Sequence, residues 1–308
     1  MTATSYHRGT RPHRARAEPQ LSTHLDVLLD GARQRVAIAA AREPLAALRQ
    51  RAEARSPGPS FRDALARPGV AVIAEVKRAS PSKGPIAPAL DAAAQAGAYR
   101  RGGAAAVSVL TEPTRFAGSL DDLAAVSATG VPALRKDFIV DTYQIWEARA
   151  AGAAAVLLIV AALDDQALAG LHAEAGAAGL DTLVEVHDEA EATRAAAVGA
   201  RIVGVNARDL RTFEVDPGAF ARLRASLPVD ALAVAESGIA TPEQVRDAGV
   251  SGADAVLVGE SLVRASDPAA AVAALVAAGQ AGAASASNDP ARRTVNDPAR
   301  PTVQGSST

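Results

Sequence analysis

The sequence contains no cysteine, few aromatic residues and almost no lysine. The absence of cysteine excludes disulfide bonds, thiolate nucleophiles and Cys-ligated metal sites, and it is compatible with the cytoplasm. Because aromatic residues make up only 3% of the chain, Ala, Val, Leu and Ile must fill the core. The histidines have no metal-ligand spacing, and the sequence has neither a Walker loop nor a dinucleotide fingerprint, so we expect no metal and no cofactor.

Long apolar runs and an excess of positive charge are also missing. No apolar run approaches the roughly 18 residues of a membrane span, and the first residues contain no apolar signal-peptide core. The formal net charge of -2 gives no electrostatic reason to expect nucleic acid or an anionic membrane as a partner. We therefore expect a soluble, cytoplasmic protein that binds neither nucleic acid nor a membrane.

The scarcity of lysine is the most informative of these features. The chain holds 32 Lys plus Arg residues, yet its only lysines are Lys77, Lys83 and Lys136. An ammonium group is not interchangeable with a guanidinium group, and of the two only lysine serves as a proton donor near neutral pH. The retained lysines therefore indicate chemistry rather than ordinary surface charge.

The composition divides the chain into three regions. Residues 1–20 are rich in Arg and lack a periodic apolar face, which predicts a disordered basic arm, and the Ala, Gly, Ser, Asn and Pro of residues 279–308 predict a disordered tail. Residues 21–278 are long enough for one α/β barrel or two smaller domains. This region begins with two helical stretches, Ser22 to about Ala41 and Leu45 to Ala54, which we expect to cover one end of a barrel or lean over its site.

A regular alternation of apolar, β-branched runs and Ala-rich amphipathic stretches follows these helices. The runs of strand length are Val70–Val76, Ala105–Leu110, Val131–Leu134, Ala155–Val160, Thr182–Val186, Arg201–Val205, Leu232–Ala235 and Ala255–Val258. Such βα units spread over about 200 residues predict a (β/α)8 TIM barrel with additional N-terminal helices. A doubly wound sheet is the alternative, which the lack of a Gly-x-Gly-x-x-Gly turn after the first strand disfavours.

Charged residues follow the ends of several predicted strands. In a barrel these ends share one mouth, where active sites of the fold are built. Glu75 and Lys77 leave the same face of the first strand, so they are either an ion pair at a strand end or two groups that converge on a ligand. Lys136 follows the third strand and Glu185 lies at the end of the fifth. So many charges on one rim favour a functional site.

The ends of the last three strands suggest how a phosphorylated ligand is held. Asn206 is the only asparagine outside the C-terminal tail, and it favours a hydroxyl-binding role over a turn. Ser237-Gly238 and Gly259 allow backbone N–H groups to approach an anion, and residues 241–244 form a capping box that starts a helix nearby. Glu260 fits this arrangement only if its carboxylate points away and its N–H contributes.

Several segments resemble indole-3-glycerol phosphate synthase, the family that closes the indole ring in tryptophan synthesis. They are IAEVKRASPSKGPI, SVLTEPTRFAGSLDDL, LRKDFIVDTYQI, LVEVHDEAE, VGVNARDLRTFEVD, AESGI and LVGESL, and the resemblance extends from about Leu25 to Leu275. It implies a lyase that cyclises 1-(2-carboxyphenylamino)-1-deoxyribulose 5-phosphate to indole-3-glycerol phosphate with loss of CO2 and water. One departure is Ala207, where the family commonly has a second Asn.

The resemblance also implies roles for residues at matching positions. Lys136 would be the general acid that protonates the sugar carbonyl, and Glu185 would be the general base or stabilise the cationic ring intermediate. Glu75 and Lys77 would assist dehydration, and Lys77 would also meet the substrate carboxylate. Asn206 and Ser237 would position the sugar chain. The remaining substrate-binding set is Ser82, Arg208, Gly238, Gly259, Glu260, Phe116, Phe138 and Glu236, in which Arg208 and the two glycines hold the phosphate and the two phenylalanines line the anthranilate pocket.

Three hypotheses remain open from the sequence. The lyase leads, followed by a related phosphosugar barrel, either an Amadori isomerase or a Schiff-base aldolase that uses Lys136, and then by a non-catalytic barrel that binds a phosphorylated ligand. In each case the expected partner is a small phosphorylated molecule, and other tryptophan-pathway enzymes are candidate protein partners. Because burial or nearby positive charge lowers the pKa of a lysine, we expect the pKa of Lys136 to lie below its ordinary value.

Overall fold

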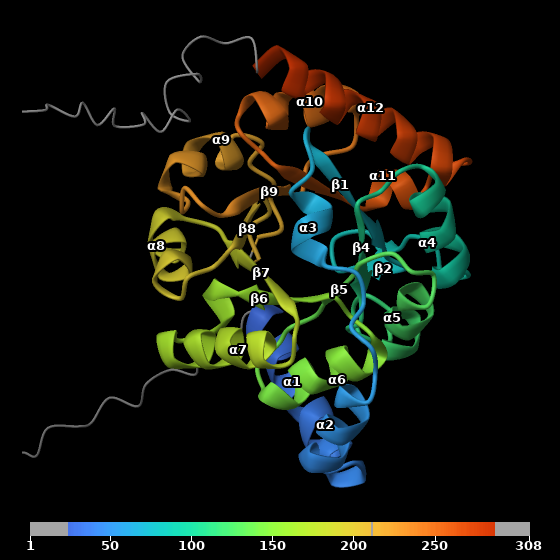
Figure 1. The fold of residues 1–308 in the computed structure, drawn as a ribbon, viewed down its shortest axis with the longest axis vertical. Helices are drawn as coiled ribbons and strands as arrows, with labels where there is room; N and C mark the ends of the chain where they lie inside the picture. The colour runs from blue at the N-terminus through green and yellow to red at the C-terminus, as the bar shows by residue number, and fades with distance from the viewer. Residues whose placement is uncertain (1–23, 211, 287–308) are drawn as a thin grey trace, which may run out of the picture.

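The computed structural model describes residues 24–210 and 212–286, and these form a closed barrel of eight parallel strands surrounded by helices (Figure 1). The strands are β1 (Ala71–Val76), β4 (Ala106–Leu110), β5 (Ala133–Lys136), β6 (Ala155–Ile159), β7 (Asp181–Val186), β8 (Ile202–Asn206), β9 (Leu232–Glu236) and β10 (Ala255–Val258), and β10 pairs with β1 to close the sheet. The predicted (β/α)8 barrel is therefore confirmed, and the doubly wound alternative is wrong.

One strand was placed differently in the sequence prediction. The run Val131–Leu134 was expected to be the third barrel strand, but β5 begins at Ala133 and extends to Lys136. Pro132 has no N–H to donate to a neighbouring strand, although its carbonyl accepts a hydrogen bond from Val107 N at 2.9 Å. Regular strand pairing therefore starts at Ala133, directly after the proline, and the strand places Lys136 at the mouth of the barrel.

The outer layer consists of helices that follow the strands. They are α4 (Ala92–Arg101), α5 (Leu120–Ser127), α6 (Thr142–Ala151), α7 (Asp165–Ala177), α8 (Glu189–Ala197), α9 (Ala219–Leu223), α10 (Pro242–Val250), α11 (Glu260–Val263) and α12 (Pro268–Ala286). Asp or Ser side chains cap the first turns of α4, α5, α7 and α8, which supplies partners for backbone N–H groups that a helix start leaves unpaired. The 3₁₀ turns η1 (Val160–Ala162) and η2 (Arg224–Ser226) and the short hairpin β2 (Ala79–Ser80) and β3 (Gly84–Pro85) complete the loops.

The hydrophobic core has two layers, one between the sheet and the helices and one inside the barrel. The inner layer contains the fully buried Ile73, Leu134 and Leu183, together with small side chains such as Ala106 and Ala255. Large and small side chains from neighbouring strands fill the barrel interior without leaving a pore. The aliphatic core expected from the low aromatic content is therefore the one observed.

The helices before β1 pack against both ends of the barrel. The helix α3 (Phe61–Leu65), which the sequence prediction missed, packs Phe61 and Leu65 into the inner core, and Arg62 N donates to Asp181 at the start of β7. It therefore closes the amino ends of the strands (Figure 1). The predicted helices α1 (His24–Arg42) and α2 (Leu45–Glu53) are present, and α1 packs Leu28 and Leu29 with Phe138 at the opposite end.

The C-terminal boundary needs a correction. The tail was expected to begin at Gly279, but α12 continues to Ala286. Val70 N donates to the carbonyl of Gly279, and a Cβ at Gly279 would lie 2.3 Å from Val70 O, so this part of the helix is packed against the start of β1. The predicted arm, residues 1–20, and residues 287–308 of the predicted tail lie outside the described residues.

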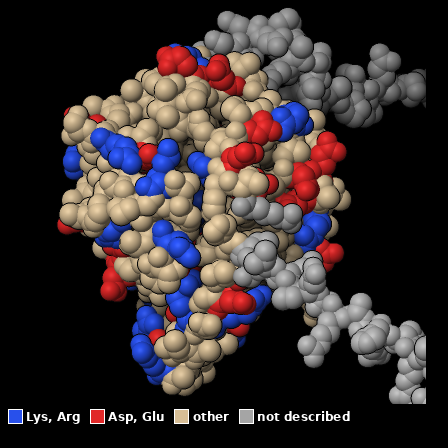
Figure 2. All heavy atoms as spheres, turned by 180° about the vertical axis from the view of Figure 1, so that it is seen from behind, with Lys and Arg blue, Asp and Glu red and all other residues tan. Residues whose placement is uncertain are grey.

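The surface is mixed in charge. The face shown in Figure 2 carries Lys and Arg side chains interspersed with Asp and Glu, with much uncharged surface between them. Among residues 24–210 and 212–286, no helix is long and apolar enough to cross a membrane.

Candidate active site

A pocket of about 570 Å³ opens at the carboxyl ends of the barrel strands. Every site residue predicted from the sequence lines it: Glu75, Lys77, Ser82, Phe116, Lys136, Phe138, Glu185, Asn206, Arg208, Glu236, Ser237, Gly238, Gly259 and Glu260. Its volume suits a single small molecule. The topology thus brings together groups that are far apart in the sequence, as the barrel prediction required.

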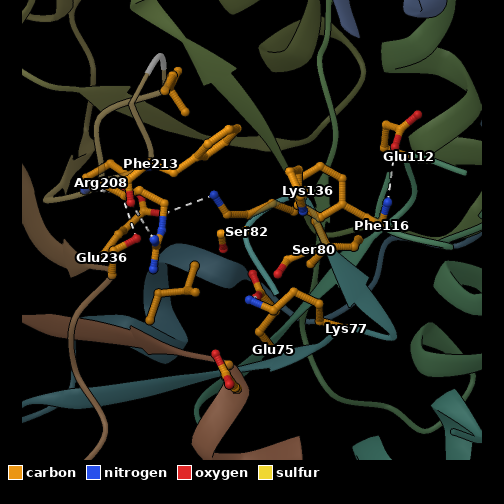
Figure 3. A pocket seen from close by; sticks show the side chains of 18 of the residues that line it. Glu75, Lys77, Ser80, Ser82, Glu112, Phe116, Lys136, Arg208, Phe213 and Glu236 are labelled. Carbon is orange, nitrogen blue, oxygen red and sulfur yellow. Dashed lines mark hydrogen bonds and ion pairs between the residues drawn. The ribbon is translucent and has the colours of Figure 1, made fainter. Parts of the chain in front are cut away.

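Lys136 occupies the centre of this pocket and contacts two buried carboxylates. Its Nζ lies 3.0 Å from Glu185 Oε2 and 3.1 Å from Glu236 Oε2, so strands β5, β7 and β9 each contribute one charge. The two carboxylate side chains are only 1% and 2% exposed. Figure 3 shows Lys136 extending across the pocket toward Glu236. The sequence prediction treated Glu236 as a substrate-binding residue and did not foresee that it shares the lysine with Glu185.

Gly204 explains how two carboxylates fit beside one ammonium group. It lies on β8 between the strands of Glu185 and Glu236, and a Cβ at this position would lie only 2.1 Å from Glu236 Oε1. Within the described residues, that same Oε1 atom is buried without a hydrogen-bond partner. The cluster is therefore compact but not saturated with hydrogen bonds.

The pKa of Lys136 is raised above its ordinary value, whereas the sequence led us to expect a lowered one. Burial lowers this pKa, but the carboxylates of Glu185, Glu236 and Glu75 raise it by more, so the net shift is upward. The expectation of a lowered pKa was wrong because the nearby charges are negative rather than positive. Lys136 is consequently an ammonium ion in the unliganded site.

The two carboxylates that contact Lys136 shift in opposite directions. Burial raises the pKa of Glu236 to about 7. The positive charge of Lys136 lowers this pKa, but repulsion from the carboxylates of Glu185 and Glu75 offsets that effect. Burial also raises the pKa of Glu185, but the positive charges of Lys136 and His187 and a hydrogen bond with Asn206 outweigh it and lower the pKa overall. Glu185 is therefore the carboxylate that stays ionised, and Glu236 titrates near neutral pH.

Glu75 and Lys77 form a second charged pair on the pocket wall, as their shared strand face predicted. Lys77 Nζ lies 2.7 Å from Glu75 Oε1, and Ser108 Oγ lies 3.5 Å from the other carboxylate oxygen. A Cβ on Gly259 would lie 2.6 Å from Glu75 Oε1 and 3.1 Å from Lys77 Nζ. Gly259 was predicted as a phosphate-binding residue, and its lack of a side chain also makes room for this pair.

Asn206 connects Glu185 to the far side of the pocket. Its Oδ1 accepts hydrogen bonds from Ser237 Oγ at 2.8 Å and from Arg208 N at 3.0 Å, while its side chain also bonds with Glu185. Ser237 has a φ of 65° and Gly238 a φ of 76°, both in the left-handed region. A serine in this region is strained, so surrounding contacts must hold the Ser237-Gly238 turn in place.

The side of the pocket formed by β9 and β10, where a phosphate site was predicted, contains a helix start and an ion pair. The capping box of Thr241 and Gln244 at the start of α10 is confirmed. The carboxylate of Glu260 accepts a hydrogen bond from Arg264 Nε at 3.1 Å and is therefore held in an ion pair. This contact agrees with the expectation that only the backbone N–H of Glu260 would serve an anion. Arg208 Nη1 donates to Phe213 O at 2.8 Å and thereby holds the loop after β8.

The apolar part of the pocket includes residues that the sequence prediction missed. Phe116 and Phe138 lie with ring centroids 6.5 Å apart, as expected of neighbouring walls. Leu25 and Leu28 of α1 and Phe213 of the β8 loop line the same cavity. The sequence showed that the two leucines have helical spacing, but it did not show which end of the barrel they cover. The φ of 61° at Phe213 left no sequence signal.

Beside the pocket, which Asp137 also lines, a further charged cluster surrounds Arg135. Arg135 donates to Asp137 at 3.1 Å, to Glu147 at 3.2 Å and to Gln144 O at 2.7 Å. Arg35 of α1 also donates to Asp137, at 3.0 Å. This cluster fixes the end of β5 and attaches α1 to the mouth.

The loop after β4 is shaped in a similar way by one buried carboxylate. Glu112 accepts hydrogen bonds from the backbone N–H groups of Thr114 at 2.9 Å and Arg115 at 2.7 Å. It also accepts one from Phe116 N at 3.3 Å (Figure 3). It therefore fixes the position of the Phe116 ring. Among the described residues, no group of three or more His, Asp and Glu side chains is arranged to hold a metal ion.

Comparisons with known proteins agree with this geometry. The sequence model of a family described as indole-3-glycerol phosphate synthase matches residues 25–275. The chain is 52% identical over 259 residues to the indole-3-glycerol phosphate synthase of Mycobacterium ulcerans, covering 84% of this chain and 95% of that one. It is 54% identical over 259 residues to the protein of that name from a Parafrankia strain, covering 83% and 96%.

Among solved structures, similarity is at the level of the fold. The chain resembles 3-hexulose-6-phosphate synthase from Salmonella typhimurium with a TM-score of 0.56 and 18% identity, covering 68% of this chain and 98% of that one. It resembles thiamine phosphate pyrophosphorylase from Pyrococcus furiosus with a TM-score of 0.53 and 16% identity, covering 72% and 99%.

Proposed function

Because the chain belongs to the indole-3-glycerol phosphate synthase family, we propose that the pocket at its barrel mouth closes the indole ring through Lys136 and its carboxylates. The activity is the cyclisation of 1-(2-carboxyphenylamino)-1-deoxyribulose 5-phosphate to indole-3-glycerol phosphate, CO2 and water in tryptophan biosynthesis, which makes the protein a lyase. The observation that supports the mechanism best is the position of Lys136 Nζ, within 3.1 Å of two buried carboxylates in a single pocket.

Lys136 acts first, as the acid in ring closure. The aromatic carbon that bears the carboxylate attacks the sugar carbonyl, a new C–C bond forms, and the carbonyl electron pair moves onto oxygen. The raised pKa of Lys136 keeps its proton in place until this oxygen becomes an alkoxide, a stronger base than any amine. Before the transfer, the ammonium charge stabilises the developing oxyanion. Loss of CO2 then returns an electron pair to the ring and restores its aromaticity.

Dehydration uses the remaining charges. The oxygen that Lys136 protonated takes a second proton from Lys77 and leaves as water, and Glu185 removes a proton from the substrate to form the new double bond. Glu75 and Lys77 assist this departure, and Lys77 meets the substrate carboxylate before CO2 is lost, which their ion pair on the pocket wall supports. Glu185 suits the role of base because its pKa is lowered and it is ionised at neutral pH.

The rest of the pocket positions the substrate. Asn206 and Ser237 hold the sugar hydroxyls, while Gly238, Gly259 and Arg208 hold the phosphate with the N–H of Glu260. Phe116 and Phe138 pack against the anthranilate ring. Ser82 and Glu236 complete the binding set, although the contact of Glu236 with Lys136 gives it an electrostatic role as well.

We further propose that the protein works in the cytoplasm and associates with other enzymes of tryptophan synthesis, and that neither nucleic acid nor a membrane is a partner. The proposed compartment follows from where biosynthesis of amino acids takes place, and the formal net charge of -2 supports the exclusion of nucleic acid. Co-purification of the native protein tests the association.

The function is tested by supplying the purified protein with the carboxyphenylamino sugar phosphate and recording indole fluorescence. We expect fluorescence to rise with turnover, and a protein that binds the substrate without producing indole-3-glycerol phosphate would contradict the proposal. Borohydride is added in a parallel reaction. A reduced covalent adduct on Lys136 would support a Schiff-base aldolase instead and would overturn the acid role.

A further inference from the structure

His187 lies directly behind Glu185, outside the set of residues that the reaction uses. Its Nε2 is 3.6 Å from Glu185 Oε1, the carboxylate oxygen that faces away from Lys136. On the other side of the ring, Nδ1 lies 3.0 Å from Glu191 Oε2 in the first turn of α8. The imidazole is thus placed between two carboxylates, one in the active site and one near the surface.

The contacts of the ring determine its protonation state. The backbone N–H of His187 also donates to Glu191 Oε2, at 2.8 Å, so this carboxylate is held as an acceptor and Nδ1 must carry a proton. In a neutral ring with that proton, the lone pair of Nε2 would face Glu185 Oε1. Within the described residues Nε2 is buried and has no hydrogen-bond partner that could compensate. The imidazolium ion, with a proton on each nitrogen and a positive charge between two carboxylates, is the form that both neighbours attract.

We propose that His187 is a positioning residue that remains an imidazolium ion in the working enzyme and holds Glu185 ionised and oriented, so that its other oxygen stays on Lys136. This inference rests on the proposed function, because Glu185 is the base of that reaction. Glu185 then lies between two cations, Lys136 in front and His187 behind. Its carboxylate cannot turn away from the substrate without losing one of them.

The other charges around His187 are consistent with this role. Burial lowers its pKa, but Glu191, Glu185 and, more remotely, Glu236 raise it by more. Arg194 lies on the same helix but donates to Asp165 at 2.6 Å and to Val160 O at 3.1 Å. Asp188 caps α8 and accepts from Glu191 N at 2.8 Å. The groups that contact the imidazole itself are therefore carboxylates.

The chain contains a matched control for this histidine. His172 on α7 is also partly buried, but its Nδ1 contacts the hydroxyl of Thr182 at 2.9 Å rather than a carboxylate. Burial lowers its pKa. We therefore expect the two histidines to titrate on opposite sides of about 6.5, the ordinary value.

The protonation state is measured by NMR titration of the imidazole nitrogens, with the variants H187Q and H172Q for assignment. At pH 7, we expect the His187 signal to be that of an imidazolium ion and the His172 signal that of a neutral ring. Glu191→Gln removes one carboxylate without touching the pocket and lowers the pKa of His187. A neutral His187 at pH 7, or a titration that E191Q leaves unchanged, would overturn the inference. This experiment needs no turnover, so it is independent of the proposed function.

The consequence for catalysis is measured across pH in single-turnover formation of indole-3-glycerol phosphate, which includes the dehydration step in which Glu185 is the base. In H187Q, glutamine carries no charge, so Glu185 retains its proton to higher pH and the acid limb of the profile moves up by about one pH unit. On the acid limb, where the rate follows the ionised fraction of Glu185, we expect the rate constant to fall about tenfold while KM stays within threefold, and H172Q to match the wild type. An unmoved acid limb in a folded H187Q would show that His187 only fills space. An inactive wild type would instead contradict the proposed function.

Discussion

Two buried charge clusters meet on β5 and differ in how completely they are satisfied. Asp137 of the Arg135 cluster accepts from Thr111 at 2.7 Å, from Phe138 N at 2.9 Å and from both arginines that surround it. In the Lys136 cluster, one ammonium group serves two carboxylates, and Glu236 Oε1 lacks a hydrogen-bond partner among the described residues.

This difference suits the Arg135 cluster to a structural role and the Lys136 cluster to a chemical one. A guanidinium group makes several fixed hydrogen bonds and does not give up its proton, so the Arg135 cluster suits a permanent joint between α1 and β5. A single ammonium group beside under-satisfied carboxylates is ready to make new contacts and to exchange a proton. Adjacent residues on one strand thus point to opposite faces and serve opposite purposes.

The largest effect on activity is expected from Lys136→Ala. Without the ammonium group, the alkoxide loses its proton donor, and we expect the single-turnover rate of indole-3-glycerol phosphate formation to fall by about a thousandfold. Substrate binding should stay within about tenfold, because the walls and the phosphate contacts are unchanged. Stopped-flow fluorescence gives the rate and equilibrium titration gives the affinity. Turnover comparable to that of the wild type would remove the acid assignment.

Asp137→Ala should show the opposite balance. Removing this carboxylate takes away one of the two ion-pair partners of buried Arg135 and the acceptor of Thr111, and we expect the free energy of unfolding to fall by about 3–5 kcal/mol. The rate per folded molecule should fall by less than tenfold. Asp216→Ala is the control, because its ion pair with Arg222 is exposed and should contribute little to stability. Equal destabilisation by both variants in urea unfolding would end the distinction between the clusters.

Glu236→Gln tests the Lys136 cluster through pH. The pKa of Glu236 is raised to about 7 in the folded state, so folding favours its protonated form. That contribution to stability is fully present below the ordinary pKa of glutamate and is lost as the pH rises through about 7. Relative to the glutamine variant, the wild type should therefore lose up to about 3 kcal/mol between pH 4.5 and pH 8. A difference in unfolding free energy that does not vary with pH would contradict the shifted pKa.

Gly259→Ala tests the second charged pair with a smaller expected effect. The added methyl group would displace the ends of Glu75 and Lys77, which are flexible enough to move, so we expect about a tenfold loss of kcat with little change in stability. Gly176 in α7 is the matched control, because a Cβ there meets nothing within 4 Å. Its alanine variant should keep full activity. Equal activity of the two variants would mean that the pair tolerates displacement.

Much of the fold was predictable because its signals are local. The β-branched runs that alternate with Ala-rich amphipathic stretches predicted the barrel, and the rarity of lysine pointed to Lys77 and Lys136. The pKa of Lys136 was predicted in the wrong direction, because the carboxylates that raise it come from other strands. Helix α3 was missed since its five residues are stabilised by burial rather than by periodicity. The pKa of Lys136 and the existence of α3 both depend on packing between segments that are distant in the sequence, which a local pattern does not show.

The most direct test of the central claim is the protonation state of Lys136 itself. Because the chain has only three lysines, selective labelling of lysine side chains gives few NMR signals, and the Lys136→Ala variant assigns the one of interest. Three carboxylates around the ammonium group predict that Lys136 still carries its proton at pH 10, near the ordinary pKa of lysine. A signal that reports a neutral amine below pH 9 would contradict the account.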